Sequence, residues 1–91
     1  MNKTNLDLGA WITIAHPMVV EGMCSTGKIQ WAAVDLEHSG LTDNFAQTAF
    51  AICDSYKVRP YARLADHSPT TAKRMLDLGA SGLIIPMINT L

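Results

Sequence analysis

The sequence predicts an α/β fold in which a parallel sheet is packed against helices. Four short apolar runs have the length of strands, and each of the first three is followed by apolar residues at helical spacing. The runs recur about every 22 to 28 residues, an interval that suits right-handed β-α-β units with short loops. The expected order is β-α-β-α-β-α-β, with strands at residues 10–14, 31–35, 60–63 and 82–86.

Residues 17–27 are expected to form the first helix. Pro17 suits the first helical turn, where its missing N–H is not needed, and Gly27 suits the C-terminal end. One face of this helix carries a stripe of residues at helical spacing: Val19, Val20, Met23, Cys24 and Gly27.

The second helix has the clearest amphipathic pattern. Thr42 is a good N-cap, and Asp43 lies in the first turn, where a negative charge complements the helix dipole. Its apolar stripe is Phe45, Ala49, Ile52, Cys53 and Tyr56.

A third helix is expected to follow residues 60–63. Ser68 and Pro69 suit the N-cap and the first helical position, and Gly79 closes the helix. The stripe expected to be buried is Ala72, Met75 and Leu76.

Composition narrows the class of protein. The chain has 91 residues, enough for one domain and too few for two. Its 48% hydrophobic and 16% charged content excludes a disordered polyelectrolyte. With a net charge of -1 and no basic patch, we expect neither a nucleic-acid nor a membrane partner.

The N-terminal residues lack the features of a secretory leader. Residues 1–8 are a polar tip without an apolar core or a small-residue cleavage site, and no apolar run approaches membrane-spanning length. We therefore expect a cytoplasmic protein with one domain over residues 9–91. In that setting Cys24 and Cys53, which lack metal-ligand spacing, are expected to be reduced core residues.

Three ionisable residues, Asp35, Glu37 and His38, stand at the end of the apolar run of residues 31–34. Ligands of parallel α/β proteins bind at the C-terminal ends of strands, so this position points to chemistry. The two acids are expected on one face of the strand, about 7 Å apart. A carboxylate near His38 can make it a general base or a proton relay. Alternatively, the acids only favour the following helix N-terminus, and His38 is an ordinary loop residue.

Arg63 ends the third predicted strand in the position equivalent to Asp35, on a neighbouring strand about 4.8 Å away. Its guanidinium can bind a carboxylate or enolate oxygen through paired hydrogen bonds. The alternative is an ion pair with Asp35 or Glu37 and no ligand. Weaker candidates are His16, which can line the same edge, Asp66 and His67 in the following loop, and Lys73 and Arg74, which are expected to face solvent.

The end of the sequence resembles the start of another helix. Asn89 or Thr90 stands where an N-cap belongs, and residues 83–85 are apolar on both faces and need cover. We therefore expect the N-terminal part of a larger α/β protein, or a fragment that must associate to complete its core.

Residues 9–12, residues 31–38, Arg63 and residues 73–90 carry a further signal, because these blocks occur in a specific order and at specific separations. Together they resemble the HpcH/HpaI aldolase/citrate lyase family, from about residue 9 to the end. The resemblance implies a (β/α)8 TIM barrel, of which this chain supplies roughly the first half. His16 and residues 27–30 depart from the family pattern, which affects substrate preference and local packing more than the fold.

Members of that family are metal-dependent pyruvate aldolases, commonly hexameric, that reversibly cleave 4-hydroxy-2-oxo acids to pyruvate and an aldehyde. The resemblance implies that Arg63 holds the keto acid and stabilises its enolate. It also implies that His38, paired with Asp35, transfers protons, with Glu37 in support. A small 2-oxo acid substrate and a homo-oligomer, hexamer or trimer, are expected for the complete protein.

The same resemblance implies a divalent cation, Mg²⁺ or Mn²⁺, with Co²⁺ as a further candidate. The family's Glu and Asp ligands belong to later strands, beyond Leu91, so the 91 residues alone are expected to be inactive. Two alternatives stay open: a citryl- or malyl-thioester lyase of the same superfamily, and a non-catalytic half-barrel.

Overall fold

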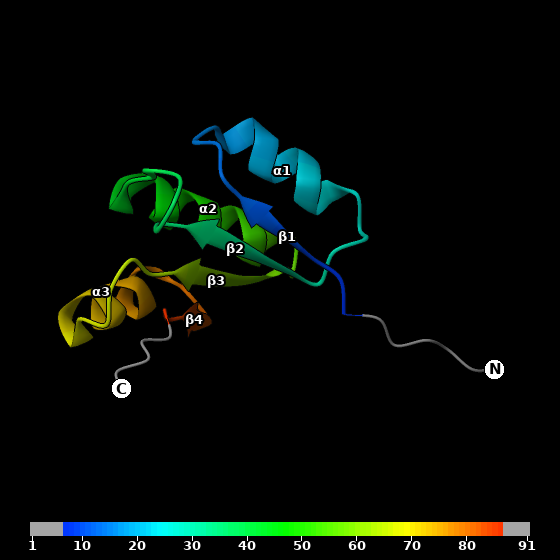
Figure 1. Cartoon of the computed structure of the whole chain (residues 1–91). Helices are drawn as coiled ribbons and strands as arrows, with labels where there is room; N and C mark the ends of the chain where they lie inside the picture. The colour runs from blue at the N-terminus through cyan, green and yellow to red at the C-terminus, as the bar shows by residue number, and fades with distance from the viewer. Residues whose placement is uncertain (1–6, 87–91) are drawn as a thin grey trace.

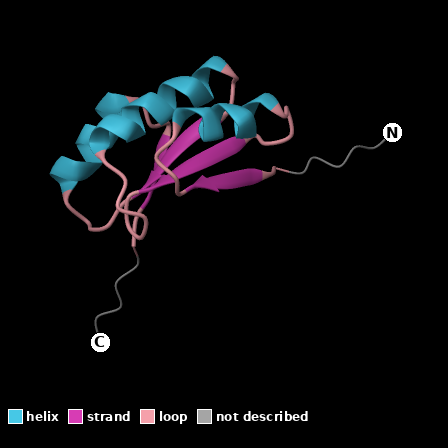
Figure 2. Ribbon diagram, turned by 90° about the horizontal axis from the view of Figure 1, so that it is seen from above, coloured by secondary structure: helices cyan, strands magenta, loops and turns pink. Residues whose placement is uncertain are grey.

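The structure, a computed structural model, describes residues 7–86 as a parallel sheet with a layer of helices along one face (Figures 1 and 2). The predicted order of elements is confirmed. The elements are β1 (Gly9–Ile12), α1 (Pro17–Ser25), β2 (Trp31–Asp35), α2 (Asp43–Ser55), β3 (Arg59–Arg63), α3 (Pro69–Leu78) and β4 (Gly82–Ile84).

The four strands lie in the sheet in chain order, β1-β2-β3-β4, and every neighbouring pair is parallel. In a doubly wound sheet the strand order reverses and helices cover both faces. Here the order never reverses, and α1, α2 and α3 lie together on one side (Figure 2). This arrangement is that of consecutive β-α units of a barrel, in which helices form only the outer layer.

The hydrophobic core lies between the sheet and this helical layer. Because side chains alternate along a strand, Ile12, Val34 and Ala62 all point to the helix side, where they meet Phe50 and Met75. The predicted core cysteines also lie here, buried and free, with their Sγ atoms 3.8 Å apart. Burial raises the pKa of Cys53 to about 12, so this thiol stays protonated at neutral pH.

Each helix begins with a side chain that accepts a hydrogen bond from a backbone N–H group of its first turn. The predicted caps are confirmed, with Thr42 Oγ1 accepting from Phe45 and Ser68 Oγ accepting from Thr71. His16, which the sequence suggested for the ligand-binding edge, caps α1 through Nδ1. Gly79 ends α3 with φ at 126°, a conformation that L side chains rarely adopt.

Four positions predicted to lie on apolar helix stripes are exposed instead: Val19, Gly27, Tyr56 and Leu76. Tyr56 donates its hydroxyl hydrogen bond to Glu21 of α1, so it joins two helices at the surface. The strands also shift slightly, since β1 begins one residue earlier than expected and β4 ends at Ile84.

Within residues 7–86, no helix covers the other face of the sheet, which carries a row of aromatic side chains. The Trp31 ring lies 6.2 Å from those of Trp11 and Tyr61, edge to face in both cases. The row needs glycines beside it, because a Cβ atom on Gly9 would lie 1.8 Å from the Trp31 ring. Trp31 therefore belongs to this open face and not to the helix-side core.

Some sequence-based expectations lie outside the described residues. These are the helix start at Asn89 or Thr90 and most of the polar tip at residues 1–8. No helix within residues 7–86 combines the length and the apolar character that crossing a membrane requires.

Candidate active site

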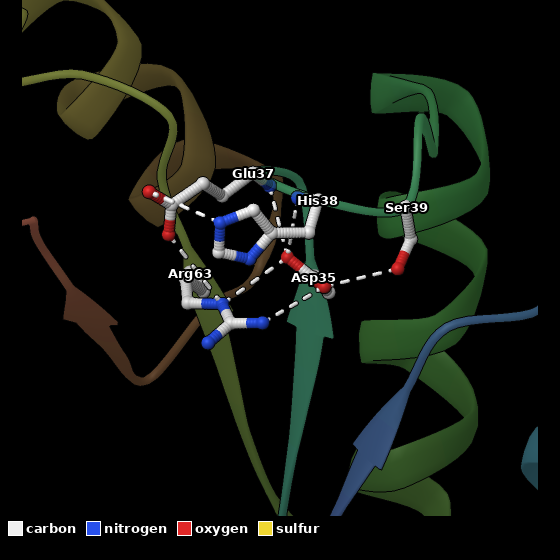
Figure 3. Close-up of polar contacts among 5 residues, drawn as sticks. All are labelled: Asp35, Glu37, His38, Ser39 and Arg63. Carbon is white, nitrogen blue, oxygen red and sulfur yellow. Dashed lines mark hydrogen bonds and ion pairs between the residues drawn. The ribbon is translucent and has the colours of Figure 1, made fainter.

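Two charged residues end neighbouring strands at the same edge of the sheet. Asp35 is the last residue of β2, Arg63 is the last residue of β3, and the two are direct partners in the strand register. Both point to the face without helices, because they lie two residues beyond the paired residues Ala33 and Tyr61. The predicted juxtaposition of Asp35 and Arg63 is confirmed (Figure 3).

Asp35 and Arg63 form a two-point ion pair. Arg63 Nε donates to Asp35 Oδ1 at 3.2 Å, and Nη2 donates to Oδ2 at 2.9 Å. Asp35 is the one buried charged side chain among the described residues, with 2% exposed, and the Arg63 side chain is 27% exposed. A planar, paired contact of this kind fixes the orientation of the guanidinium as well as its position.

Asp35 also holds the turn that follows β2. Its Oδ1 accepts hydrogen bonds from the backbone N–H groups of Glu37 and His38, both at 3.0 Å, and its Oδ2 accepts one from Ser39 Oγ. Residues 36–38 therefore form a turn. The expectation that Glu37 continues the strand two residues after Asp35 is wrong, because the Asp35 carboxylate competes successfully for the backbone at this point.

The ion pair sets the electrostatics of the site. The Arg63 guanidinium holds the pKa of Asp35 well below its usual range; burial opposes this shift, and the hydrogen bonds from His38, Ser39 and Glu37 add to it. Asp35 in turn raises the pKa of Arg63. Asp35 is therefore an anion at any ordinary pH and cannot itself deliver or remove a proton near neutrality.

Glu37 and His38 approach the ion pair from the turn. Glu37 Oε1 lies 3.7 Å from Arg63 Nε, and Glu37 Oε2 lies 3.6 Å from His38 Nε2. The expected side-chain pairing of His38 with Asp35 is not found, because Asp35 binds the backbone N–H of His38 and the imidazole lies beside Glu37 (Figure 3). The imidazole is 64% exposed, so it can meet a ligand above this edge of the sheet.

One edge of the guanidinium keeps unused donors. Asp35 occupies the Nε–Nη2 side, and no described residue accepts a hydrogen bond from Nη1. The Nη1–Nη2 edge can therefore take a second carboxylate or an enolate oxygen in the same paired geometry. The guanidinium carbon Cζ lies over the Trp11 ring, 4.1 Å from the ring centroid.

The weaker candidates have local partners. Asp66 accepts from the backbone N–H of Ser68, and His67 Nε2 contacts the Pro86 carbonyl oxygen, joining the β3-α3 loop to the end of β4. Lys73 pairs with Asp77 and Arg74 with Asp43, and all four are exposed, as expected for Lys73 and Arg74.

Sequence reasoning missed two contributors to the site, Ser39 and Trp11. Ser39 is four residues beyond Asp35, and a hydroxyl in that turn was a signal for a bond back to the carboxylate. For Trp11 the signal was the small residue opposite it, because Ala33 leaves room for a large ring to lie across β2 toward β3.

The described residues do not fit a metal site. Within residues 7–86 no group of three or more His, Cys, Asp or Glu side chains is placed to hold an ion. The Asp35 oxygens, the best placed candidates, already accept from Arg63, Ser39 and two backbone groups. The metal dependence that the sequence resemblance implies therefore stays a prediction.

The fold and the site together define a class. Consecutive parallel β-α units are typical of the barrel enzymes, whose active sites lie at the C-terminal ends of the strands, where Asp35 and Arg63 form their pair. No family model matches the sequence.

Comparison with known proteins shows what the chain is similar to within that class. The chain is 31% identical to a 4-hydroxy-2-oxovalerate aldolase of Novosphingobium aromaticivorans, over 93% of this chain and 32% of that protein. It is 30% identical to a 4-hydroxy-2-oxo-heptane-1,7-dioate aldolase of Salmonella dublin, over 89% of this chain and 30% of that protein.

A solved HpcH/HpaI aldolase/citrate lyase family protein from Burkholderia cenocepacia superposes with a TM-score of 0.80 at 25% identity, over 91% of this chain and 33% of that one. These relatives and this structure are aldolases or members of the HpcH/HpaI aldolase/citrate lyase family, and the fold of this chain matches the N-terminal part of a TIM-barrel aldolase. It spans about a third of the length of the curated relatives it matches.

Proposed function

We propose that these residues belong to a carbon–carbon lyase that reversibly cleaves a 4-hydroxy-2-oxo acid to pyruvate and an aldehyde. The observation that supports this most is the Arg63 guanidinium, fixed by Asp35 with its second paired edge unused. Relatives named as aldolases of hydroxy-oxo acids point to the same reaction type.

In this proposal Arg63 binds the acid and stabilises the charge that develops on it. When the bond between C3 and C4 breaks, its electron pair moves into the 2-oxo acid half and forms the pyruvate enolate. A fixed guanidinium stabilises that negative charge without having to reorganise. Because Asp35 holds the Nε–Nη2 edge of the guanidinium, the ligand meets the Nη1–Nη2 edge already in place.

His38 is the proton carrier in this scheme. A neutral imidazole takes the proton of the C4 hydroxyl as the aldehyde forms, and the resulting imidazolium returns it to C3 of the enolate to give pyruvate. The protons therefore balance without an external acid or base. Glu37, 3.6 Å from His38 Nε2, orients the imidazole.

We further propose, from the family resemblance, that the complete protein needs a divalent cation and forms a homo-oligomer, with a small 2-oxo acid as substrate. The complete protein here means the full product of the reading frame that encodes these residues. No step above uses the cation. A cytoplasmic location likewise stays a prediction.

The test is pyruvate release from a series of 4-hydroxy-2-oxo acids by the complete protein, with Mg²⁺ or Mn²⁺ added. We expect release by the unchanged protein, a large loss in Arg63→Ala and a partial loss in Arg63→Lys, which keeps the charge but not the paired geometry. Undiminished release by Arg63→Ala would contradict the proposal. So would cleavage confined to citryl or malyl thioesters.

A further inference from the structure

Besides the longer ion pair with Glu37, two contacts hold the Arg63 guanidinium. Asp35 binds one edge through two hydrogen bonds, and Cζ lies over the Trp11 ring, 4.1 Å from its centroid. The two parallel hydrogen bonds fix the position of the guanidinium edge that Asp35 binds. The guanidinium plane can still rotate about the line that joins it to the carboxylate. An indole ring 4.1 Å from Cζ limits that rotation, because it occupies the space beside the guanidinium. Trp11 therefore adds a constraint that Asp35 cannot supply.

The sheet register explains why Trp11 can reach Arg63 from two strands away. Trp11 of β1 is paired with Ala33 of β2, and Ala33 is paired with Tyr61 of β3, two residues before Arg63. Ala33 is small and lies on the face without helices, yet it is 0% exposed. A large ring lying across Ala33 accounts for both facts, and it brings the indole beneath the end of β3.

The contact is also electrostatically favourable. The face of an indole is its negative side, and Arg is the cation most often found stacked on it. The Arg63 side chain is 27% exposed, so the contact is partly shielded from water. Of the aromatic side chains among the described residues, only Trp11 stacks on a cation.

We propose that Trp11 is a positioning residue, which sets the tilt of the Arg63 guanidinium so that its Nη1–Nη2 edge faces the ligand carboxylate. The identity of that ligand, a 2-oxo acid, rests on the function proposed above. The stacking itself does not, and it can be measured without a ligand.

The experiment compares the complete protein with Trp11→Leu, Trp11→Phe and the matched control Trp31→Leu. Trp31 is the same residue type on the same open face, but it does not stack on Arg63. The first measurement is the NMR signal of the Arg63 Nε–H group without ligand. We expect a ring-shifted, slowly exchanging signal that Trp11→Leu returns to ordinary values, and that Trp31→Leu leaves in place.

The second measurement is the dissociation constant for sodium pyruvate. We expect Trp11→Leu to weaken binding roughly 5- to 30-fold, the range of a partly shielded cation–π contact, and Trp11→Phe to recover most of the loss. Trp31→Leu should bind pyruvate like the unchanged protein.

The outcomes separate the two proposals. If Arg63→Ala leaves pyruvate affinity unchanged, the proposed ligand is wrong, while the Nε–H signal still tests the stacking. If Arg63→Ala abolishes binding but Trp11→Leu changes neither the signal nor the affinity, the positioning role is overturned. Equal losses in Trp11→Leu and Trp31→Leu would also overturn it, because they would show a general effect on the open face.

Discussion

Asp35 connects the fold to the site through a single carboxylate. It accepts hydrogen bonds from the Arg63 guanidinium on β3, from two backbone N–H groups of the following turn and from the hydroxyl of Ser39. Removing its charge therefore has consequences for stability as well as for ligand binding. Substitutions of single residues can separate the role in stability from the role in ligand binding.

We expect Asp35→Asn to lower the free energy of unfolding of the complete protein by about 2 to 3 kcal/mol. The amide can still accept from the turn, but the substitution removes the closer of the two acidic partners of Arg63 and leaves only Glu37, at 3.7 Å. Urea denaturation measures the change. Asp77→Asn is the matched control, since its exposed pair with Lys73 is worth less than about 0.5 kcal/mol. Equal effects of the two substitutions would contradict a special role for Asp35.

The low pKa of Asp35 also predicts how stability depends on pH. The unfolded carboxyl has a pKa of about 3.9. Because the folded pKa lies below that value, the unfolded state binds a proton that the folded state does not. The contribution of Asp35 is therefore complete above about pH 5 and decreases as the pH falls through the unfolded pKa toward the folded one.

Urea midpoints measured between about pH 7 and pH 3 test this dependence. The difference between the unchanged protein and Asp35→Asn should shrink as the medium becomes more acidic. A difference that stays constant over this range would show that the folded pKa of Asp35 is not lowered.

At the scale of elements, the helices could be predicted from the local sequence, whereas the exposure of individual side chains depends on tertiary contacts. Thr42 and Ser68 were identified from sequence because an N-cap depends only on neighbours within one turn. The exposure of Leu76 was not predictable in this way, because it depends on which other elements pack against α3.

The caps of α2 and α3 should each contribute about 1 kcal/mol. We expect Thr42→Ala and Ser68→Ala to lower the free energy of unfolding by that amount, because each leaves a first-turn N–H without its acceptor. Thr48→Ala is the control, since that hydroxyl bonds a carbonyl within α2 and its loss should be close to neutral. Thermal or urea unfolding distinguishes the three variants.

The same contrast applies to the site. The proximity of Asp35 and Arg63 could be predicted from sequence, because the C-terminal ends of parallel strands lie at the same end of the sheet. The turn at Glu37 and the orientation of His38 could not, because they depend on which backbone groups the Asp35 carboxylate binds. The position of Trp11 across Ala33 could not be predicted either, because it depends on the register of three strands.

At the scale of the whole molecule, the described residues leave one sheet face and two sheet edges without cover. Trp11, Ile84 and Ile85 are 41%, 36% and 48% exposed, and β1 and β4 have a free side within residues 7–86. A barrel would bury these groups in its interior and pair both edge strands.

We therefore expect the 91-residue chain, made alone, to self-associate. Sedimentation should show species heavier than a monomer, and Ile84→Lys should reduce their population by placing a charge on the open edge. A monodisperse monomer that unfolds cooperatively would show that the open face needs no partner.

The central claim is that the fixed guanidinium of Arg63 stabilises a pyruvate enolate, and exchange of the pyruvate methyl protons for deuterium tests it without any aldehyde. In D2O with Mg²⁺ or Mn²⁺, the complete protein should accelerate loss of the methyl signal, Arg63→Ala should abolish the acceleration, and His38→Ala should slow it. Exchange no faster than in buffer, or exchange that persists in Arg63→Ala, would contradict the account.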